Sequence, residues 1–260
     1  MSNMFNPKRF GNYLLYDMRN AWNNCSLSAI ICGITPLIFF LIMELFSIVF
    51  KGGPVDNAGA VQTSAFVVSI MVAVMVLPVK IYGSVTDKRQ GSNFLMLPAS
   101  TLEKTLSIAI VTCVLIPALV WGIFFLSDWL LSVSFPIRYG HSLPATVREV
   151  WDYNVSNVIS INYFGIEYLA WCCCILLFTL GAVFFRRAKS GKTILCWFGA
   201  NIVVVLLLEL IFKDPSMISI NIEGPEELVK FFNTTYSTTG FAFIAVFLAC
   251  IFLRIKYMKH

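Results

Sequence analysis

Six long apolar runs, separated by short polar connections, are the feature that most constrains how this chain folds. They cover about residues 28–50, 65–83, 106–131, 163–185, 194–212 and 236–253. A helix needs about 20 mostly apolar residues to cross the hydrocarbon core of a bilayer, and each run is close to that length. The runs are too continuous to be the alternating strands of a membrane barrel. We therefore expect an all-α integral membrane protein whose residues 28–260 form six transmembrane helices.

Composition and the first residues agree with this class. Of the 260 residues, 58% are hydrophobic and 13% are charged, whereas a soluble domain is about 45–50% apolar. The excess of apolar side chains needs a lipid surface to cover it. The first run starts after residue 27, is too long for the core of a signal peptide and lacks a small-residue cleavage site. We expect it to remain in the mature protein.

The distribution of basic residues predicts the orientation in the membrane. With six crossings, both termini and the second and fourth connections share one side, which holds 14 of the 19 Lys and Arg residues. The other side holds Lys51, Arg138, Arg148, Lys213 and Lys230. Because basic connections stay in the cytoplasm, we expect both termini there, with the chain in a plasma (inner) membrane. The net charge of +5 then reflects topology and indicates no nucleic-acid partner.

Residues 1–27 precede the first run and contain an amphipathic segment. One helical face carries Phe10, Tyr13, Leu14, Met18, Ala21 and Trp22, while neighbouring Arg and Asn residues point elsewhere. This pattern predicts a cytoplasmic helix that lies in the membrane interface. The alternative is that the segment extends the first transmembrane helix.

No pattern of residues indicates a catalytic, metal or cofactor site. The eight cysteines lie in or beside the apolar runs, where they act as small hydrophobic residues. The consecutive cysteines at 172–174 would point about 100° apart on a helix, so they cannot converge on one ion. The string SGKT at 190–193 lacks the first glycine of a phosphate-binding loop, because Arg186 stands there. The two histidines have no partners at catalytic or metal-ligand spacing.

Four acidic residues are candidates for a site in the outer half of the membrane: Glu44, Asp128, Glu167 and Glu209. Each lies in or at the end of a different apolar run. An ionised acid at the bilayer centre costs about 2.5–3.5 kcal/mol, and less near the interface. The four are either hydrated at the mouths of their helices or line an acidic vestibule that binds cations. Glu44, roughly 9 Å from the outer end of its run, is the best single candidate.

The connection at residues 84–104, SVTDKRQGSNFLMLPASTLEK, contains a local stop and start signal. Ser100 and Glu103 have the spacing of a capping box, which predicts that the third transmembrane helix starts at Ser100. Pro98 disfavours helix at the residue before it and so predicts a sharp break ahead of the cap.

The same connection has two halves of opposite polarity, which makes it the second candidate site. Its first half is charged and should face water. Its second half is apolar and must be buried against lipid headgroups or against another protein. The residues concerned are Asp87, Lys88, Arg89, Phe94, Leu95, Met96, Leu97 and Pro98.

The stretch TDKRQGSNFLMLPASTLEK, residues 86–104, resembles the first cytoplasmic connection in permease subunits of ABC-2 type transporters from Bacteroidota. In those chains a charged turn is followed by a leucine-rich, LPAS-like segment and a Glu-Lys pair. The layout is also similar: an interfacial helix, six spans, both ends cytoplasmic and a short helix before the last span, here in EGPEELVKFF. The motif covers about 20 residues, and the layout covers most of the chain.

The resemblance implies a membrane-spanning permease subunit of an ABC transporter, by analogy an exporter. Its partners would be cytoplasmic ABC ATPase subunits, a second permease copy or paralogue, and the lipid bilayer. ATP would be hydrolysed on the ATPase subunits, so the chain itself would be no enzyme and would need no cofactor. Residues 84–104 would be the coupling loop. Two alternatives stay open: an ATP-independent, ion-coupled transporter that uses the outer acids, and a membrane assembly subunit that transports nothing.

Overall fold

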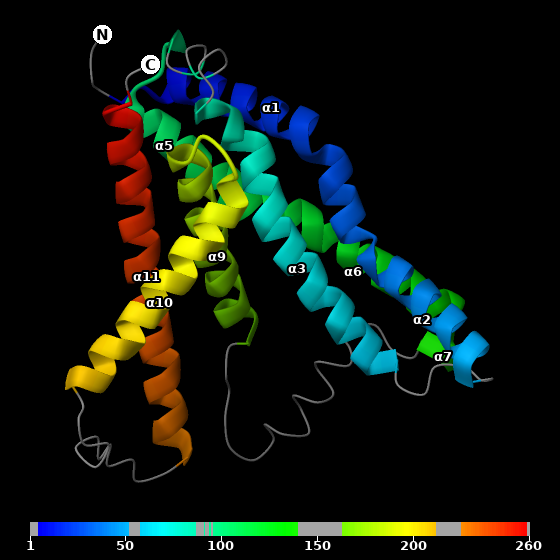
Figure 1. The fold of residues 1–260 in the computed structure, drawn as a ribbon. Coiled ribbons are helices and arrows are strands. Elements are labelled where there is room, and N and C mark those ends of the chain that lie inside the picture. Colours follow the sequence, from blue (N-terminus) through cyan, green and yellow to red (C-terminus); the bar gives the residue numbers. More distant parts are fainter. Residues whose placement is uncertain are drawn as a thin grey trace.

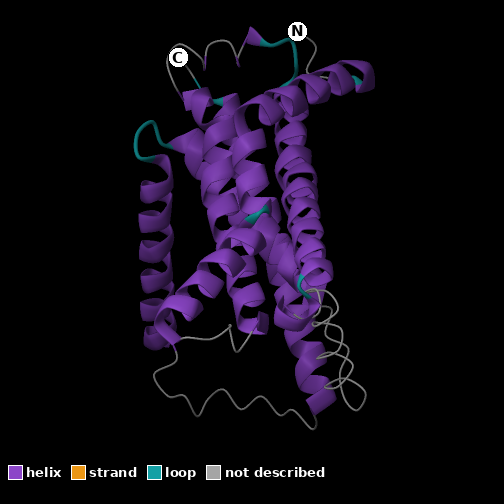
Figure 2. Cartoon of the chain, turned by 90° about the vertical axis from the view of Figure 1, so that its right-hand side faces the viewer, coloured by secondary structure: helices purple, strands orange, loops and turns teal. Residues whose placement is uncertain are grey.

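The computed structural model describes residues 5–51, 58–86, 91, 94, 96–139, 163–211 and 225–258. In this part of the chain every regular element is a helix, as Figure 2 shows. The prediction of an all-α fold is therefore confirmed.

The helices follow the apolar runs but differ from them in their ends. In chain order they are α1 (Pro7–Gly33), α2 (Thr35–Lys51), α3 (Ala58–Tyr82), the 3₁₀ helix η1 (Gly83–Thr86), α5 (Thr101–Ile110), the π-helix η2 (Val111–Leu115), α6 (Ile116–Ser134), α7 (Pro136–Tyr139), α9 (Tyr163–Phe184), α10 (Lys189–Ile211) and α11 (Pro225–Lys256). Three stretches are long and apolar enough to cross a membrane by themselves: Ser64–Thr86, Thr101–Ser134 and Thr234–Lys256. Two bent pairs, α1 with α2 and α9 with α10, raise the number to five if each pair is one span. The described residues thus fit a multi-pass membrane protein with three to five candidate spans, where the sequence predicts six.

A proline bends the path from α1 into α2 by 41°. Pro36 has no N–H, so it cannot donate to the carbonyl of Cys32 four residues earlier. The hydroxyls of Thr35 and Ser69 donate to that carbonyl instead, at 2.5 and 2.6 Å. The helix therefore breaks beside the proline. The boundary that the sequence predicts between residues 27 and 28 lies inside α1, which continues to Gly33.

Two glycines let neighbouring helices approach closely. A Cβ on Gly33 at the end of α1 would lie 2.6 Å from the Cβ of Ile123 in α6. A Cβ on Gly181 in α9 would lie 2.9 Å from the Cβ of Thr193 in α10. Such distances are too short for two carbons, so each crossing depends on the missing side chain. The second crossing sets the hairpin in which α9 and α10 differ in direction by 119°.

The core lies around α3 and α9, in the centre of the bundle (Figure 1). Its fully buried apolar side chains include Leu77, Ile108, Ile175, Leu176 and Ile251, which come from α3, α5, α9 and α11. Helix α10 differs, because side chains such as Leu195 and Phe198 on it are largely exposed in the single chain. A helix that is apolar on an uncovered face is expected where lipid or another membrane protein covers it.

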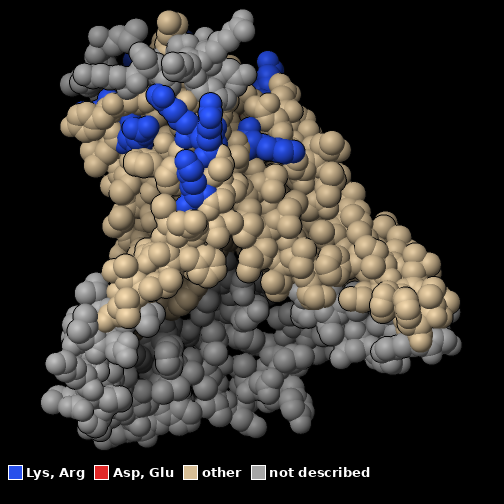
Figure 3. Space-filling model, in the orientation of Figure 1, with Lys and Arg blue, Asp and Glu red and all other residues tan. Residues whose placement is uncertain are grey.

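The start of α1 and the end of α11 lie at the same end of the molecule, where the first turns of α1 run across the bundle (Figure 1). Lys and Arg side chains gather toward this end on the face seen in Figure 3, and no Asp or Glu of the described residues is visible there. We call this the terminal end of the bundle.

Candidate functional site

The first turn of α1 is fixed by a cap at the terminal end. Asn6 precedes the helix with extended backbone, and its side-chain oxygen accepts hydrogen bonds from the N–H groups of Lys8 and Arg9 at 3.1 and 3.4 Å. Pro7 at the first helical position has no N–H that would need a partner. The start of α1 is therefore encoded locally.

The first turn of α5 carries the capping box that the sequence predicts, and this prediction is confirmed. The side chain of Ser100 accepts from the N–H of Glu103 at 3.3 Å, and the Glu103 carboxylate accepts from the N–H of Ser100 at 2.8 Å. The cap fixes the direction in which the chain enters the long helical stretch Thr101–Ser134.

Glu103 also joins the two capped helices, a role that the sequence did not reveal. Its carboxylate accepts from both Nε and Nη2 of Arg9, the closest at 2.8 Å, and from the N–H of Asn6 at 3.0 Å. The Glu103 side chain is fully buried, whereas that of Arg9 is 30% exposed. The Arg9 hydrogen bonds, helped by the N–H groups of Asn6 and Ser100, lower the pKa of Glu103 to about 2. The carboxylate, which precedes the predicted span at residue 106, is therefore ionised at neutral pH.

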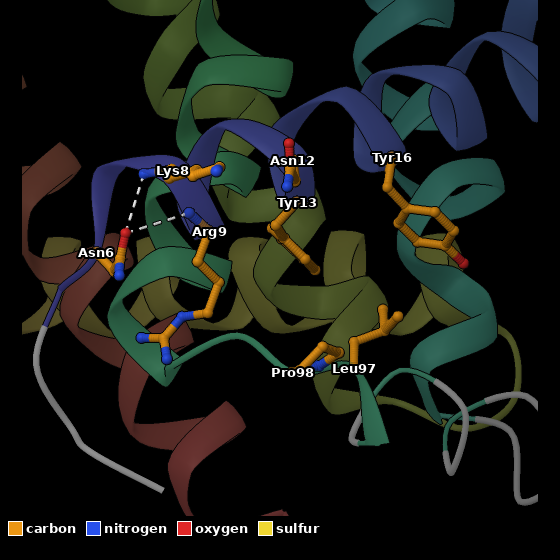
Figure 4. Close-up of a pocket in the computed structure, with 8 residues that line it drawn as sticks. All are labelled: Asn6, Lys8, Arg9, Asn12, Tyr13, Tyr16, Leu97 and Pro98. Carbon is orange, nitrogen blue, oxygen red and sulfur yellow. Dashed lines mark hydrogen bonds between the residues drawn. The ribbon is translucent and has the colours of Figure 1, made fainter.

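A hollow of 460 Å³ lies between the start of α1 and the residues just before α5. We call it the terminal groove, and it is lined by Asn6, Lys8, Arg9, Asn12, Tyr13, Tyr16, Leu97 and Pro98. Figure 4 shows Tyr13 extending from α1 toward Leu97 and Pro98, and Arg9 extending from the same helix to one side of them. The groove thus combines aromatic and aliphatic walls with basic groups at one end.

The structure describes four of the eight predicted coupling-loop residues: Phe94, Met96, Leu97 and Pro98. Asp87, Lys88, Arg89 and Leu95 lie outside the described residues. Leu97 and Pro98 line the terminal groove.

Phe94 and Met96 point to different surroundings. Phe94 packs against the main core, its carbonyl accepts from Nζ of Lys104 at 2.8 Å, and the same Nζ lies 5.0 Å from the centre of its ring. Met96 is 77% exposed. The apolar half of the loop is thus held to the bundle by one side chain and presents another outward.

The structure describes the side chains of two of the four outer acids, Asp128 and Glu44. Asp128 is fully buried and accepts from the hydroxyl of Tyr139 at 2.6 Å. Glu44 is partly exposed on α2. Glu167 and Glu209 lie on α9 and α10, and their side chains are outside the described part. The far ends of α2 and α10 lie on opposite sides of the molecule (Figure 1).

A buried carboxylate on α1 was missed by the sequence reasoning. Asp17 is 3% exposed and accepts from the hydroxyls of Tyr82 and Ser107 at 3.0 and 2.7 Å, so it joins α1 to α3 and α5. It follows Tyr13 by four residues and precedes the buried Ala21 by four. This spacing places it on the packed face of the helix, which is the signal that could have revealed it.

Among the described residues, no three Asp, Glu, His or Cys side chains lie close enough to hold a metal ion. All eight cysteines are free thiols. Comparisons of the chain with protein-family models, with curated proteins and with solved structures gave no match.

Proposed function

We propose that this chain is the permease subunit of an ABC transporter, with six spans and both termini in the cytoplasm of an inner membrane. The terminal groove and the adjacent Met96 form the docking surface for a cytoplasmic ATPase subunit. The transporter also contains a second permease copy or paralogue, and it works as an exporter. ATP is hydrolysed on the ATPase subunits.

The exposure of Met96 is the observation that carries this proposal. A large apolar side chain that faces water is costly to leave uncovered when it extends an apolar surface. Met96 stands beside the apolar walls of the terminal groove and belongs to a segment that Phe94 anchors to the core. An apolar anchor beside basic groups suits a partner surface with a pocket and a negatively charged rim.

The connections of the terminal groove suggest how a motion of the ATPase would reach the bundle. Glu103 lies in the first turn of the stretch Thr101–Ser134, so a push on the groove acts on one end of a long helix. Through Arg9 the same carboxylate holds α1, which packs against α3 and α6. One contact therefore moves two helical segments together.

The test compares two methionine variants of the tagged chain, purified from its own membrane in a mild detergent. Met96→Ala should reduce the amount of copurified P-loop ATPase by about tenfold, because a few anchor side chains dominate such interfaces. Met71→Ala is the matched control, since Met71 is 57% exposed on α3, away from the loop. It should leave the ATPase bound. Equal ATPase recovery with both variants, or no ATPase with the unchanged chain, would contradict the proposal.

Phe94→Ala is a less specific test of docking. Because Phe94 packs on the core and lies beneath Lys104, removal of its ring also loosens the loop. We expect Phe94→Ala to release the ATPase as Met96→Ala does, but with a loss of thermal stability that Met96→Ala does not cause.

A further inference from the structure

Four aromatic rings meet between the helices α3, α6 and α9. Trp121 on α6 lies 5.7 Å from Trp171 and 6.3 Å from Tyr168, both on α9, measured between ring centroids. Phe66 on α3 lies 6.4 Å from Trp121. We call these four residues the aromatic cluster. Trp171 is near the middle of α9 and only 2% exposed.

The two tryptophans carry hydrogen-bond donors that the protein leaves unpaired. Among the buried side-chain N and O atoms of the described residues, those without a hydrogen-bond partner are Nε1 of Trp121 and Nε1 of Trp171. The rings are T-shaped, at 74°, so the edge of one ring can direct its N–H at the face of the other. Such a contact is weak and serves one donor only. Buried unpaired donors destabilise a fold, so packing alone would favour Phe at these positions.

The cluster adjoins an irregular part of the third long helix. Residues Val111–Leu115 form a π-turn, in which the N–H of Ile116 donates to the carbonyl of Val111. Pro117 cannot donate to the carbonyl of Cys113, and the hydroxyl of Tyr168 donates to it at 2.7 Å. Turns of the π type recur at functional sites, and together with a proline they mark where a helix can repack.

We propose that the aromatic cluster binds an uncharged, mainly apolar, ring-containing molecule, whose carbonyl or ether oxygen accepts hydrogen bonds from Trp121 and Trp171. A ring-containing molecule suits these side chains, because aromatic groups pack edge to face or offset face to face. The two N–H groups require an acceptor oxygen. None of the four residues is charged, and two neutral donors do not offset the desolvation of a full charge, so an ionic ligand does not fit. The role of this cluster as the cargo site of the transporter rests on the function proposed above. The binding of such a molecule does not depend on that function.

The experiment uses the purified chain in detergent and two planar probes of nearly the same shape, fluorenone and fluorene. Fluorenone has a carbonyl oxygen, and fluorene lacks it. Fluorenone should bind at least fivefold more tightly, as measured by equilibrium dialysis. Trp121→Phe and Trp171→Phe keep an aromatic ring but delete the N–H, so each should remove most of that preference. Trp197→Phe on α10, whose ring is 48% exposed, is the matched control and should retain the preference.

A second measurement needs no variant and so does not depend on how the variants fold. In the chain labelled with ¹⁵N-tryptophan, fluorenone should move two of the six indole N–H signals downfield, and fluorene should not. Equal affinity for the two probes, or no fluorenone-specific shift, would overturn the proposal. Because no ATPase is present, failure here leaves the docking proposal untouched. Likewise, fluorenone selectivity in a chain that recruits no ATPase would remove only the transport role.

Discussion

Gly181→Ala tests whether the crossing of α9 and α10 depends on a missing side chain. The new Cβ would lie 2.9 Å from both Cβ and Cγ2 of Thr193. Thr193 is buried, and its hydroxyl donates to the carbonyl of Lys189 at 2.7 Å. Rotation of the Thr193 side chain moves Cγ2 but not Cβ. The contact can therefore be relieved only if α10 moves away from α9.

The expected cost follows from two opposing effects. Overpacking costs about 1–3 kcal/mol, while replacing glycine by alanine in a helix gains about 1 kcal/mol. We expect Gly181→Ala to lower the free energy of unfolding by up to about 2 kcal/mol. Gly122→Ala on α6 is the matched control, because a Cβ there meets nothing within 4 Å. That variant should be as stable as the unchanged chain or more stable.

Unfolding of the detergent-solubilised protein by SDS, followed by far-UV circular dichroism, measures both variants. Adding Thr193→Gly to Gly181→Ala removes the obstructing Cβ. Thr193→Gly should then lower the free energy of unfolding less in the Gly181→Ala background than it does alone. A double-mutant cycle detects this difference. If Gly181→Ala is as stable as Gly122→Ala, the close approach of α9 and α10 is not a real constraint.

Three further predictions concern the terminal end, the outer acids and the topology. In a Cys-free chain, a cysteine in place of Asp87 should react with a membrane-impermeant label only from the cytoplasm. A cysteine in place of Glu226 should react only from outside. The reverse pattern would refute the predicted orientation. Glu44→Gln should leave transport nearly unchanged if Glu44 is merely hydrated, and a large loss in a well-expressed variant would instead favour ion coupling. Glu103→Gln should speed trypsin cleavage after Arg9, since an amide cannot accept all the N–H groups that the carboxylate accepts; unchanged cleavage would deny the ion pair a structural role. Because the pKa of Glu103 is about 2, below the ordinary value of about 4.3, the pair should persist from pH 8 to pH 5 and weaken only as the pH falls from about 4.3 toward 2.

Local signals in the sequence predicted well. The capping box at Ser100 and Glu103 depends on residues three apart, so it could be recognised without the fold. Long apolar runs likewise predicted helices, because the length and composition of a run decide whether its helix lies in lipid or in water. The predicted spans 28–50 and 106–131 instead ran unbroken through Pro36 and Pro117, the two places where the structure bends or widens a helix.

Contacts between distant residues could not be predicted. Arg9 and Glu103 are far apart in the chain, and nothing local pairs them. The outward direction of Met96 and the inward direction of Phe94 depend on which helix lies beneath the loop. The aromatic cluster needs three helices at defined rotations, which the apolar pattern does not specify because nearly every position in these runs is apolar. Tertiary packing decides all three.

Photo-crosslinking from position 96 in native membranes tests the central claim most directly. A photoreactive amino acid placed at Met96 should form a covalent adduct with a P-loop ATPase, identified by mass spectrometry. The same amino acid at Met71 should give lipid adducts instead, because that position faces outward from a predicted span. Adducts with the ATPase at position 96 alone would support docking at the terminal groove. Lipid adducts at both positions would mean that the exposed methionine rests on the membrane and that the loop is not the coupling element.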